Sequence, residues 1–219
     1  MNVQTDTLRL FDIARWLGLA LPDEDKPITG VSIDTRTLAV GNLFVALPGT
    51  KVDGHVFIAD AVKQGAAAVL CTTLPHACEV PVLVYPDLED ALARMATAYR
   101  VHMPCRVVAL TGSNGKTTVK EMLASILPKP VFATPGNWNN HLGVPLSVMQ
   151  LNPTYRYAVF ELGANHAGEI AHTVAMVKPH VTLINNIASA HIEGFGSLDG
   201  TARAKGEIHQ GLCANGTAV

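Results

Sequence analysis

One segment constrains the fold of this chain more than any other, the run Val-Val-Ala-Leu-Thr-Gly-Ser-Asn-Gly-Lys-Thr-Thr at residues 107–118. Its apolar start is typical of a buried strand, and two glycines then break the chain before a Lys-Thr pair. Behind that pair, apolar residues recur at helical spacing from Val119 to Ile126, and Pro128 ends the expected helix. Strand, glycine turn and helix in this order are typical of a loop that binds the phosphates of a nucleoside triphosphate.

The chemistry of such a loop assigns a task to each part. Gly112 and Gly115 are expected to take positive φ, which turns consecutive N–H groups toward one anion. Lys116 would reach the outer phosphates, the Thr117 hydroxyl would bind Mg²⁺, and the N-terminus of the following helix would add its dipole. The general pattern has glycine at position 110, where this chain has Leu110, so a chance glycine-rich turn stays open as an alternative. The expected nucleotide-binding residues are Thr111, Gly112, Ser113, Asn114, Gly115, Lys116, Thr117 and Thr118.

Composition bounds the class of protein. The 219 residues are 48% apolar, which is enough for a substantial core, and the net charge is −2 without a basic run. We therefore expect small ligands and no nucleic acid partner. No run of about 20 apolar residues is present, so no membrane insertion is expected. The four cysteines lack metal or disulfide spacing, which favours free, mostly buried thiols in a cytoplasmic protein; they are Cys71, Cys78, Cys105 and Cys213.

The organisation of the chain changes once, near Tyr85. An amphipathic helix at 8–19 and short strands up to residue 84 predict a small α/β domain over residues 1–85. A helix at 88–101 then leads into a second domain over 86–219, in which strands alternate with helices, as in a parallel sheet with crossover helices. The predicted fold class is therefore α/β: a small N-terminal domain is followed by a phosphate-loop domain with a mainly parallel sheet. The expected strands lie at 28–33, 43–46, 67–70, 82–84, 107–110, 158–162 and 181–184.

The last residues predict a further strand. Residues 208–213 look like the close of a helix that starts near Leu198, and residues 217–219 look like the opening of a strand. We therefore expect the second domain to be truncated, and a sheet that lacks its later strands would end on an unpaired edge.

Three further features carry possible chemistry. Glu161 follows an apolar strand, where parallel sheets place ligands, so it is a candidate Mg²⁺ ligand or else an ordinary glutamate of a turn. His191 follows the next strand and could ligate a metal or simply be solvated. Lys205, taken alone, would be a surface lysine. The segment 135–145 combines three asparagines with glycines, and its amides could bind a substrate or cap turns.

Together these motifs resemble the Mur ligase family. The resemblance is carried by Thr-Gly-Ser-Asn-Gly-Lys-Thr-Thr at 111–118, Asn-Trp-Asn-Asn at 137–140, Glu-Leu-Gly-Ala-Asn-His-Ala-Gly-Glu-Ile at 161–170 and Ala-His-Ile-Glu-Gly-Phe-Gly at 190–196. In the first domain it is carried by Ser-Ile-Asp-Thr-Arg at 32–36, by residues 41–49 and by Asp-Gly-His at 53–55. The family's own loop has no glycine equivalent to position 110, which explains Leu110. The run at 161–166 favours the members that add D-alanyl-D-alanine to UDP-N-acetylmuramoyl-tripeptide.

The resemblance implies an ATP-dependent amide ligase of peptidoglycan precursor synthesis. In the family a substrate carboxylate attacks the γ-phosphate of ATP, and an incoming amine converts the acyl phosphate into an amide. The implied catalytic residues are Lys116, Glu161, His191 and Lys205, with Thr117 and Glu161 on a first Mg²⁺ and His191 on a second. Lys205 matches a family lysine that reacts with CO₂, and its carbamate would supply an anionic oxygen to the metal.

The resemblance also implies a UDP-sugar site in the first domain. The expected contacts are Ser32, Asp34, Thr35, Arg36 and Gly49, with Arg36 on the diphosphate, although an arginine solvated beside Asp34 stays open. The three asparagines Asn137, Asn139 and Asn140 would line the region between phosphate and the muramoyl substrate.

Several alternatives remain. They are a sister Mur ligase, a folylpolyglutamate synthetase-like ligase, and a non-catalytic UDP-sugar-binding fragment. Family members continue with a third domain, which is expected to be absent here, so this piece is expected to turn over weakly or not at all. A monomer is expected.

Overall fold

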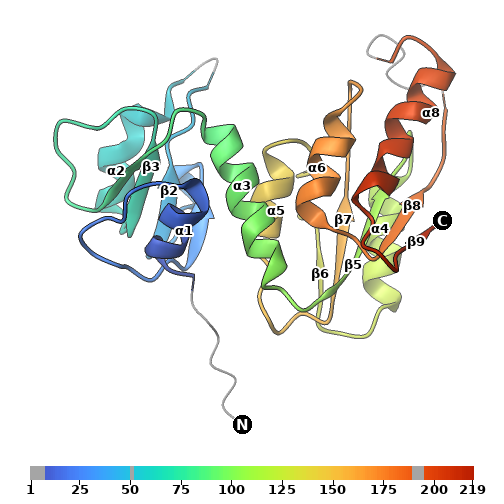
Figure 1. Ribbon diagram of the computed structural model, residues 1–219, viewed down its shortest axis with the longest axis horizontal. Coiled ribbons are helices and arrows are strands. Elements are labelled where there is room, and N and C mark those ends of the chain that lie inside the picture. Colours follow the sequence, from blue (N-terminus) through green and yellow to red (C-terminus); the bar gives the residue numbers. More distant parts are fainter. Residues whose placement is uncertain (1–7, 50–51, 189–194) are drawn as a thin grey trace. The chain divides into compact units, whose positions relative to one another are not determined.

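A computed structural model describes residues 8–49, 52–188 and 195–219 (Figure 1). The chain forms two compact units, Met1–Met95 and Ala96–Val219. The division falls within helix α3 (Leu88–Val101), later than the boundary at Tyr85 that the sequence predicted. The start of α3 belongs to the first unit because the hydroxyl of Tyr85 donates to Asp90 Oδ2 at 2.7 Å and Arg94 Nη2 donates to the carbonyl of Trp16 at 3.1 Å.

The first unit contains one parallel sheet with strand order β1-β2-β3-β4. Its strands are β1 (Gly30–Ser32), β2 (Asn42–Val45), β3 (Ala68–Cys71) and β4 (Val82–Val84), and its helices are α1 (Leu10–Leu17), η1 (Thr35–Thr37), η2 (Gly54–Phe57) and α2 (Ile58–Lys63). All residues of β2 and β3 are buried, as expected for parallel strands covered on both faces.

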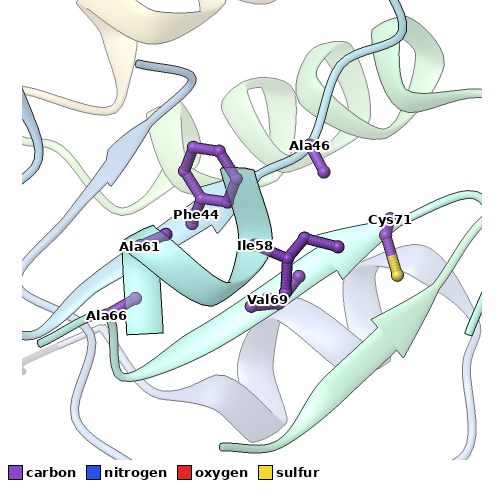
Figure 2. Packing of buried hydrophobic residues seen from close by; sticks show 7 residues of the cluster. All are labelled: Phe44, Ala46, Ile58, Ala61, Ala66, Val69 and Cys71. Carbon is purple, nitrogen blue, oxygen red and sulfur yellow. The ribbon is translucent and has the colours of Figure 1, made fainter. Parts of the chain in front are cut away.

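One face of this sheet carries an apolar cluster that Figure 2 shows from close by. Phe44 of β2 and Val69 of β3 pack there with Ile58 and Ala61 of α2. Because successive side chains of a strand alternate between faces, Leu43 and its neighbours on the other face belong to a second buried layer. The carboxyl ends of β1 and β2 are thereby fixed, together with the turns that follow them.

The second unit contains a five-stranded parallel sheet with order β6-β7-β5-β8-β9. Its strands are β5 (Arg106–Thr111), β6 (Val131–Ala133), β7 (Tyr157–Glu161), β8 (Val181–Ile184) and β9 (Thr217–Ala218). Its helices, besides the end of α3, are α4 (Lys116–Ile126), α5 (Gly143–Val148), α6 (Glu169–Val177), α8 (Leu198–Gly206) and η3 (Glu207–Gly211). Since β5 lies between β7 and β8, the loops after these three strands meet at one edge of the sheet.

The crossovers place the helices on two faces. Right-handed connections put α4 on one face, where it contacts β6 and β7, and put α5 and α6 on the other, where they contact each other. The predicted α/β class with mainly parallel sheet is confirmed. The strand at the end of the sequence is present as β9, which pairs with β8. None of the helices in the described ranges is long and apolar enough to cross a membrane.

Strand β6 and helix α5 are among the elements that the sequence analysis missed. Strand β6 is only three residues long and follows Pro128 and Pro130, so its pattern is too short to stand out. Helix α5 begins at Gly143, inside the segment 135–145 that was expected to be a turn. Of the four cysteines, two are buried, Cys71 and Cys105.

Candidate active site

The phosphate loop joins the end of β5 to the start of α4. Gly115 caps α4 with φ +72°, as its position in the motif predicted. Gly112 does not take positive φ, so that expectation was wrong. Space at Gly112 is nevertheless tight, because a Cβ atom would lie 3.0 Å from the Cβ of Asn185 and 3.3 Å from the backbone nitrogen of Asn186. The loop is therefore packed directly against the segment that follows β8.

The N–H groups of the loop do not all face one anion. Ser113 donates its N–H to the carbonyl of Asn186 at 3.1 Å, and Asn114 donates its N–H to Asn186 Oδ1 at 3.0 Å. In return, Asn185 Nδ2 donates to the carbonyl of Asn114 at 2.7 Å. The amides in the first turn of α4 have no intrahelical acceptor, so they are available to an anion.

The remaining side chains of the loop divide into buried and accessible groups. Thr111 is buried and donates to the carbonyl of Leu162 at 2.8 Å, and Ser113 donates to that of Ala188 at 3.1 Å, so both hold the loop in place. Lys116 lies back over the loop and donates to the carbonyl of Gly112 at 3.0 Å. Thr118 is exposed in the first turn of α4.

Glu161 is the centre of the site. It ends β7, it is 2% exposed, and its carboxylate accepts hydrogen bonds at both oxygens. The hydroxyl of Thr117 donates to Oε2 at 2.9 Å, and Asn139 Nδ2 donates to Oε1 at 2.8 Å. The backbone N–H of Glu161 donates to the hydroxyl of Thr134 at 3.1 Å. Residues from α4, β7 and the segment before α5 thus meet at one carboxylate beside the phosphate loop.

The donor set at this point fits Mg²⁺. Thr117 and Glu161 offer a hydroxyl and a carboxylate oxygen, which are hard ligands that this ion prefers, and a nucleotide would supply phosphate oxygens next to them. His191, the predicted ligand of a second metal, lies outside the described residues.

Lys205 is not a surface lysine. Its side chain lies on α8, it is 2% exposed, and within the described residues its ammonium group makes no hydrogen bond or ion pair. Nζ lies 5.8 Å from the centre of the Phe195 ring. Burial, with repulsion from Lys116, lowers the pKa of Lys205 below its ordinary value. A neutral amine is therefore easier to reach here than at the surface.

The three asparagines have different surroundings. Asn139 holds Glu161, as described above. Asn140 accepts the N–H of Gly143 at 2.8 Å through its Oδ1 atom, so its side chain holds the turn that leads into α5, which agrees with the turn interpretation of these amides. The carbonyl of Asn137 accepts the N–H of Asn139 at 2.7 Å, and Asn137 itself is exposed.

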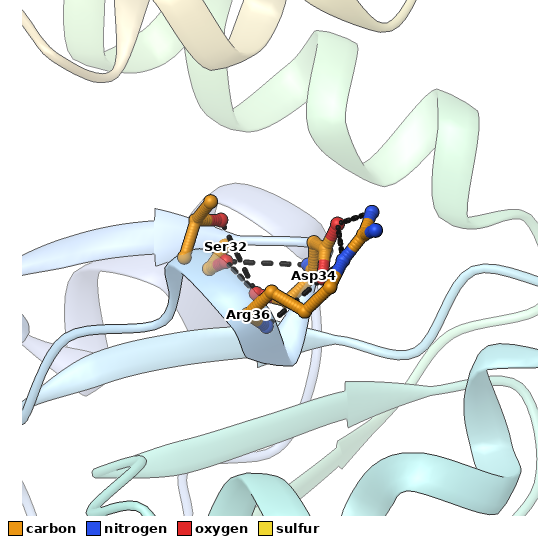
Figure 3. A network of polar contacts seen from close by, with 4 residues as sticks. Ser32, Asp34 and Arg36 are labelled. Atoms are coloured by element: carbon orange, nitrogen blue, oxygen red, sulfur yellow. Dashed lines mark hydrogen bonds and ion pairs between the residues drawn. The ribbon is translucent and has the colours of Figure 1, made fainter.

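In the first unit, the turn after β1 brings Ser32, Asp34 and Arg36 together, as Figure 3 shows. Ser32 donates its hydroxyl to the carbonyl of Asp34 at 2.9 Å, and Asp34 caps η1, which begins at Thr35. Arg36 donates to both carboxylate oxygens of Asp34 from Nε at 3.0 Å, which holds the pKa of Asp34 below its ordinary value. The arginine side chain is 86% exposed, so it is both paired with Asp34 and open to solvent.

Gly49 lies in a tight turn after β2. Its N–H donates to the carbonyl of Val52 at 3.2 Å, and a Cβ atom at Gly49 would lie 2.6 Å from that same oxygen. Below the turn, Asp53 Oδ1 lies 2.6 Å from His55 Nδ1, and His55 Nε2 accepts the N–H of Thr72 at 3.0 Å. These bonds tie the turn to the end of β3.

Sequence reasoning missed Thr134, which accepts the N–H of Glu161, and it also missed a buried lysine near the site. Lys120 of α4 is buried, although its apolar neighbours Met122 and Ile126 are exposed. The only available signal was its spacing, because residues 120, 123, 124 and 127 form one helical stripe.

Comparison with known proteins identifies the class. Residues 110–219 match the Mur ligase middle domain, and residues 27–100 match the Mur ligase family, catalytic domain. The chain belongs to the Mur ligase family.

Two curated relatives of this chain have the same activity in their names. The UDP-N-acetylmuramoyl-tripeptide–D-alanyl-D-alanine ligase of Escherichia coli (strain K12) is 50% identical over 201 residues, which cover 91% of this chain and 44% of that protein. The ligase of the same name from Bacillus subtilis (strain 168) is 39% identical over 200 residues, which cover 90% and 44%. This chain therefore spans a little under half the length of these curated relatives.

Solved structures agree. MurF from Acinetobacter baumannii superposes with a TM-score of 0.88 at 38% identity, over 99% of this chain and 49% of that one. The MurF ligase from Thermotoga maritima in complex with ADP superposes with a TM-score of 0.78 at 33% identity, over 86% and 44%.

Proposed function

We propose that this chain carries the nucleotide site and the UDP-substrate site of a cytoplasmic, ATP-dependent ligase. That ligase adds D-alanyl-D-alanine to UDP-N-acetylmuramoyl-tripeptide in peptidoglycan precursor synthesis. The observation that carries the proposal is the buried carboxylate of Glu161, which Thr117 and Asn139 hold at the head of α4 beside the phosphate loop. The names of the relatives supply the substrates.

In the first step the substrate carboxylate would attack the γ-phosphate of ATP, and ADP would leave. In the second step the D-alanyl-D-alanine amine would attack the carbonyl carbon of the acyl phosphate, and inorganic phosphate and a proton would leave as the amide forms. Lys116 would move from the Gly112 carbonyl to the outer phosphates, and the first turn of α4 would donate N–H groups to them. Mg²⁺, when bound, neutralises phosphate charge, and Thr117 and Glu161 would hold it, with His191 at a second metal.

The first unit would hold the UDP part of the substrate. Ser32 would face the nucleoside, and Thr35 and Arg36 with the turn at Gly49 would face the diphosphate. Pairing with Asp34 does not exclude this role, because Arg36 engages the carboxylate through Nε and Nη2 and no bond to Nη1 is present in the described part of the chain. In the second unit, Asn137 would line the region between the phosphates and the muramoyl group.

Lys205 is proposed to react with CO₂. The neutral Nζ amine attacks the carbon of CO₂, so an N–C bond forms while one C=O π bond opens onto oxygen. The nitrogen then loses one proton to solvent, and the neutral amine becomes an anionic carbamate. The lowered pKa of Lys205 supplies the neutral amine, and the nearby charge of Lys116 favours the anionic product. With ¹³C-labelled bicarbonate, we expect one slowly exchanging carbamate signal by NMR that disappears in Lys205→Met; a signal unchanged by that substitution would contradict the assignment.

The proposal is tested by separate calorimetric titrations of the chain with UDP-N-acetylmuramoyl-tripeptide and with ATP. We expect both to bind, and we expect ATP binding to weaken strongly when Mg²⁺ is removed with EDTA. Binding of the UDP ligand without Mg²⁺-dependent ATP binding would indicate a UDP-sugar-binding protein instead. ATP binding without UDP-ligand binding would favour a folylpolyglutamate synthetase-like ligase, and tighter binding of a UDP-muramoyl ligand with a shorter peptide would favour a sister Mur ligase.

A further inference from the structure

Lys120 is buried at a position where an apolar side chain could be buried at a lower cost in free energy. It is 1% exposed, and it is the one residue of α4 that is buried. Its ammonium group donates to the carbonyl of Thr134 at 2.8 Å and to that of Gly136 at 3.3 Å. Its ion-pair partner, Glu121 Oε1 at 3.1 Å, belongs to a side chain that is 66% exposed. Burying a charged group costs free energy unless hydrogen bonds or an opposite charge compensate for it. The hydrogen bonds to these two carbonyls therefore indicate the role of Lys120.

Both carbonyls belong to the segment 134–139, which links β6 to the turn before α5. Both ends of this segment touch Glu161. At one end, the hydroxyl of Thr134 accepts the N–H of Glu161 at 3.1 Å. At the other, Asn139 Nδ2 donates to Glu161 Oε1 at 2.8 Å, and the carbonyl of Asn139 accepts the N–H of Gly163 at 2.8 Å. The path of this segment therefore decides where the carboxylate points.

We propose that Lys120 is a positioning residue for the magnesium site. Its ammonium group fixes segment 134–139, and the segment then holds the Glu161 carboxylate in the orientation that pairs with Thr117. Helix α4 thus contributes to the site twice. The hydroxyl of Thr117 contacts Glu161 directly, and one turn later Lys120 holds segment 134–139. This inference depends on the proposed function only for the identity of the ion that Glu161 binds.

The test compares Lys120→Met with Lys129→Met. Lys129 is a matched control because its Nζ also donates to a backbone carbonyl, that of Ala124 at 2.6 Å, but at the far end of α4. The affinity for Mn²⁺ in the presence of ATP is measured by electron paramagnetic resonance, and the affinity for ATP is measured in EDTA. In Lys120→Met we expect Mn²⁺ to bind about tenfold more weakly, as for loss of other groups that orient metal ligands, with ATP affinity in EDTA nearly unchanged. Wild-type Mn²⁺ affinity in Lys120→Met would overturn the proposal.

A double-mutant cycle separates positioning from a general loss of stability. If Lys120 acts through the segment that carries Asn139, the losses in Mn²⁺ affinity of Lys120→Met and Asn139→Ala should be less than additive. Fully additive losses would show that Lys120 acts elsewhere. If Lys120→Met does not fold, the same measurements are made on Lys120→Gln, which has a neutral polar side chain at this position.

A readout without any ligand keeps this inference distinct from the proposed function. In the metal-free chain, Lys120→Met should speed hydrogen exchange of the Gly163 N–H, while Lys129→Met should not. If the wild type binds no Mn²⁺ with ATP, the proposed function fails, and the exchange of Gly163 still decides whether Lys120 orders the segment.

Discussion

At the residue scale, two buried lysines show how differently a fold can accommodate an ammonium group. Lys120 has two backbone carbonyls and a carboxylate within hydrogen-bond distance. Lys205 has no hydrogen bond within the described residues, and burial lowers its pKa. The first lysine is fixed in place by its acceptors, whereas the lowered pKa of the second favours its neutral form. This difference separates a residue that fixes structure from one that is available for chemistry.

The lowered pKa of Lys205 predicts a pH dependence of stability. Between its folded pKa and the ordinary value of 10.5, the unfolded chain binds a proton that the folded chain lacks, so stability rises with pH in that window. In CO₂-free buffer, Lys205→Met should remove this contribution and raise the free energy of unfolding at neutral pH by about 1 kcal/mol. Urea unfolding at several pH values measures both effects. An unchanged pH slope, or a less stable variant, would contradict the interpretation.

At the element scale, the start of α4 depends on one glycine. Gly115 has φ +72°, and a Cβ atom there would lie 3.1 Å from Asn185 Nδ2. Gly115→Ala should therefore destabilise the chain by about 1 kcal/mol and weaken ATP binding, because the first turn of α4 must shift. Gly206→Ala is the control, since Gly206 has a helical backbone and no atom would lie within 4 Å of its Cβ. That variant should be stabilised by up to about 1 kcal/mol in urea unfolding. Equal effects of the two substitutions would show that the conformation of Gly115 does not matter.

Elements with a strong local pattern were predictable from the sequence. The apolar run into Thr111, the positive φ of Gly115 and the helix from Lys116 were predicted correctly, and so was the strand that ends at Glu161. These features are local, because strand length, glycine position and helical spacing are all written in consecutive residues.

The rest depended on contacts that are distant in sequence. The apolar spacing of α4 did not reveal that Lys120 is buried while Met122 and Ile126 are exposed, since the sheet decides which stripe of a helix packs. The link between Asn139 and Glu161 joins two segments whose proximity follows from the pairing of β6 with β7, and β6 itself was missed. The capture of the Ser113 and Asn114 amides by Asn186 was hidden for the same reason.

At the scale of the whole molecule, the two units divide the proposed ligands between them. The residues assigned to UDP lie at 32–49 in the first unit, and those assigned to ATP lie at 111–118 in the second. We therefore expect Mg²⁺ and ATP to slow hydrogen exchange at 112–118 and to leave exchange at 32–49 unchanged. We expect UDP to slow exchange at 32–49 and to leave exchange at 112–118 unchanged. Hydrogen exchange followed by mass spectrometry measures this. Protection of 32–49 by ATP alone would contradict the division.

The most direct test of the central claim is the affinity for Mg²⁺-ATP of Lys116→Ala, measured by calorimetry beside Lys63→Ala as a control from the first unit. The ammonium group of Lys116 lies over the loop at the head of α4, so its loss should weaken binding at least about tenfold, or roughly 1.4 kcal/mol, while the control binds like the wild type. If Lys116→Ala binds Mg²⁺-ATP as tightly as the wild type, the loop at 111–118 is not the phosphate site and the proposed function falls with it.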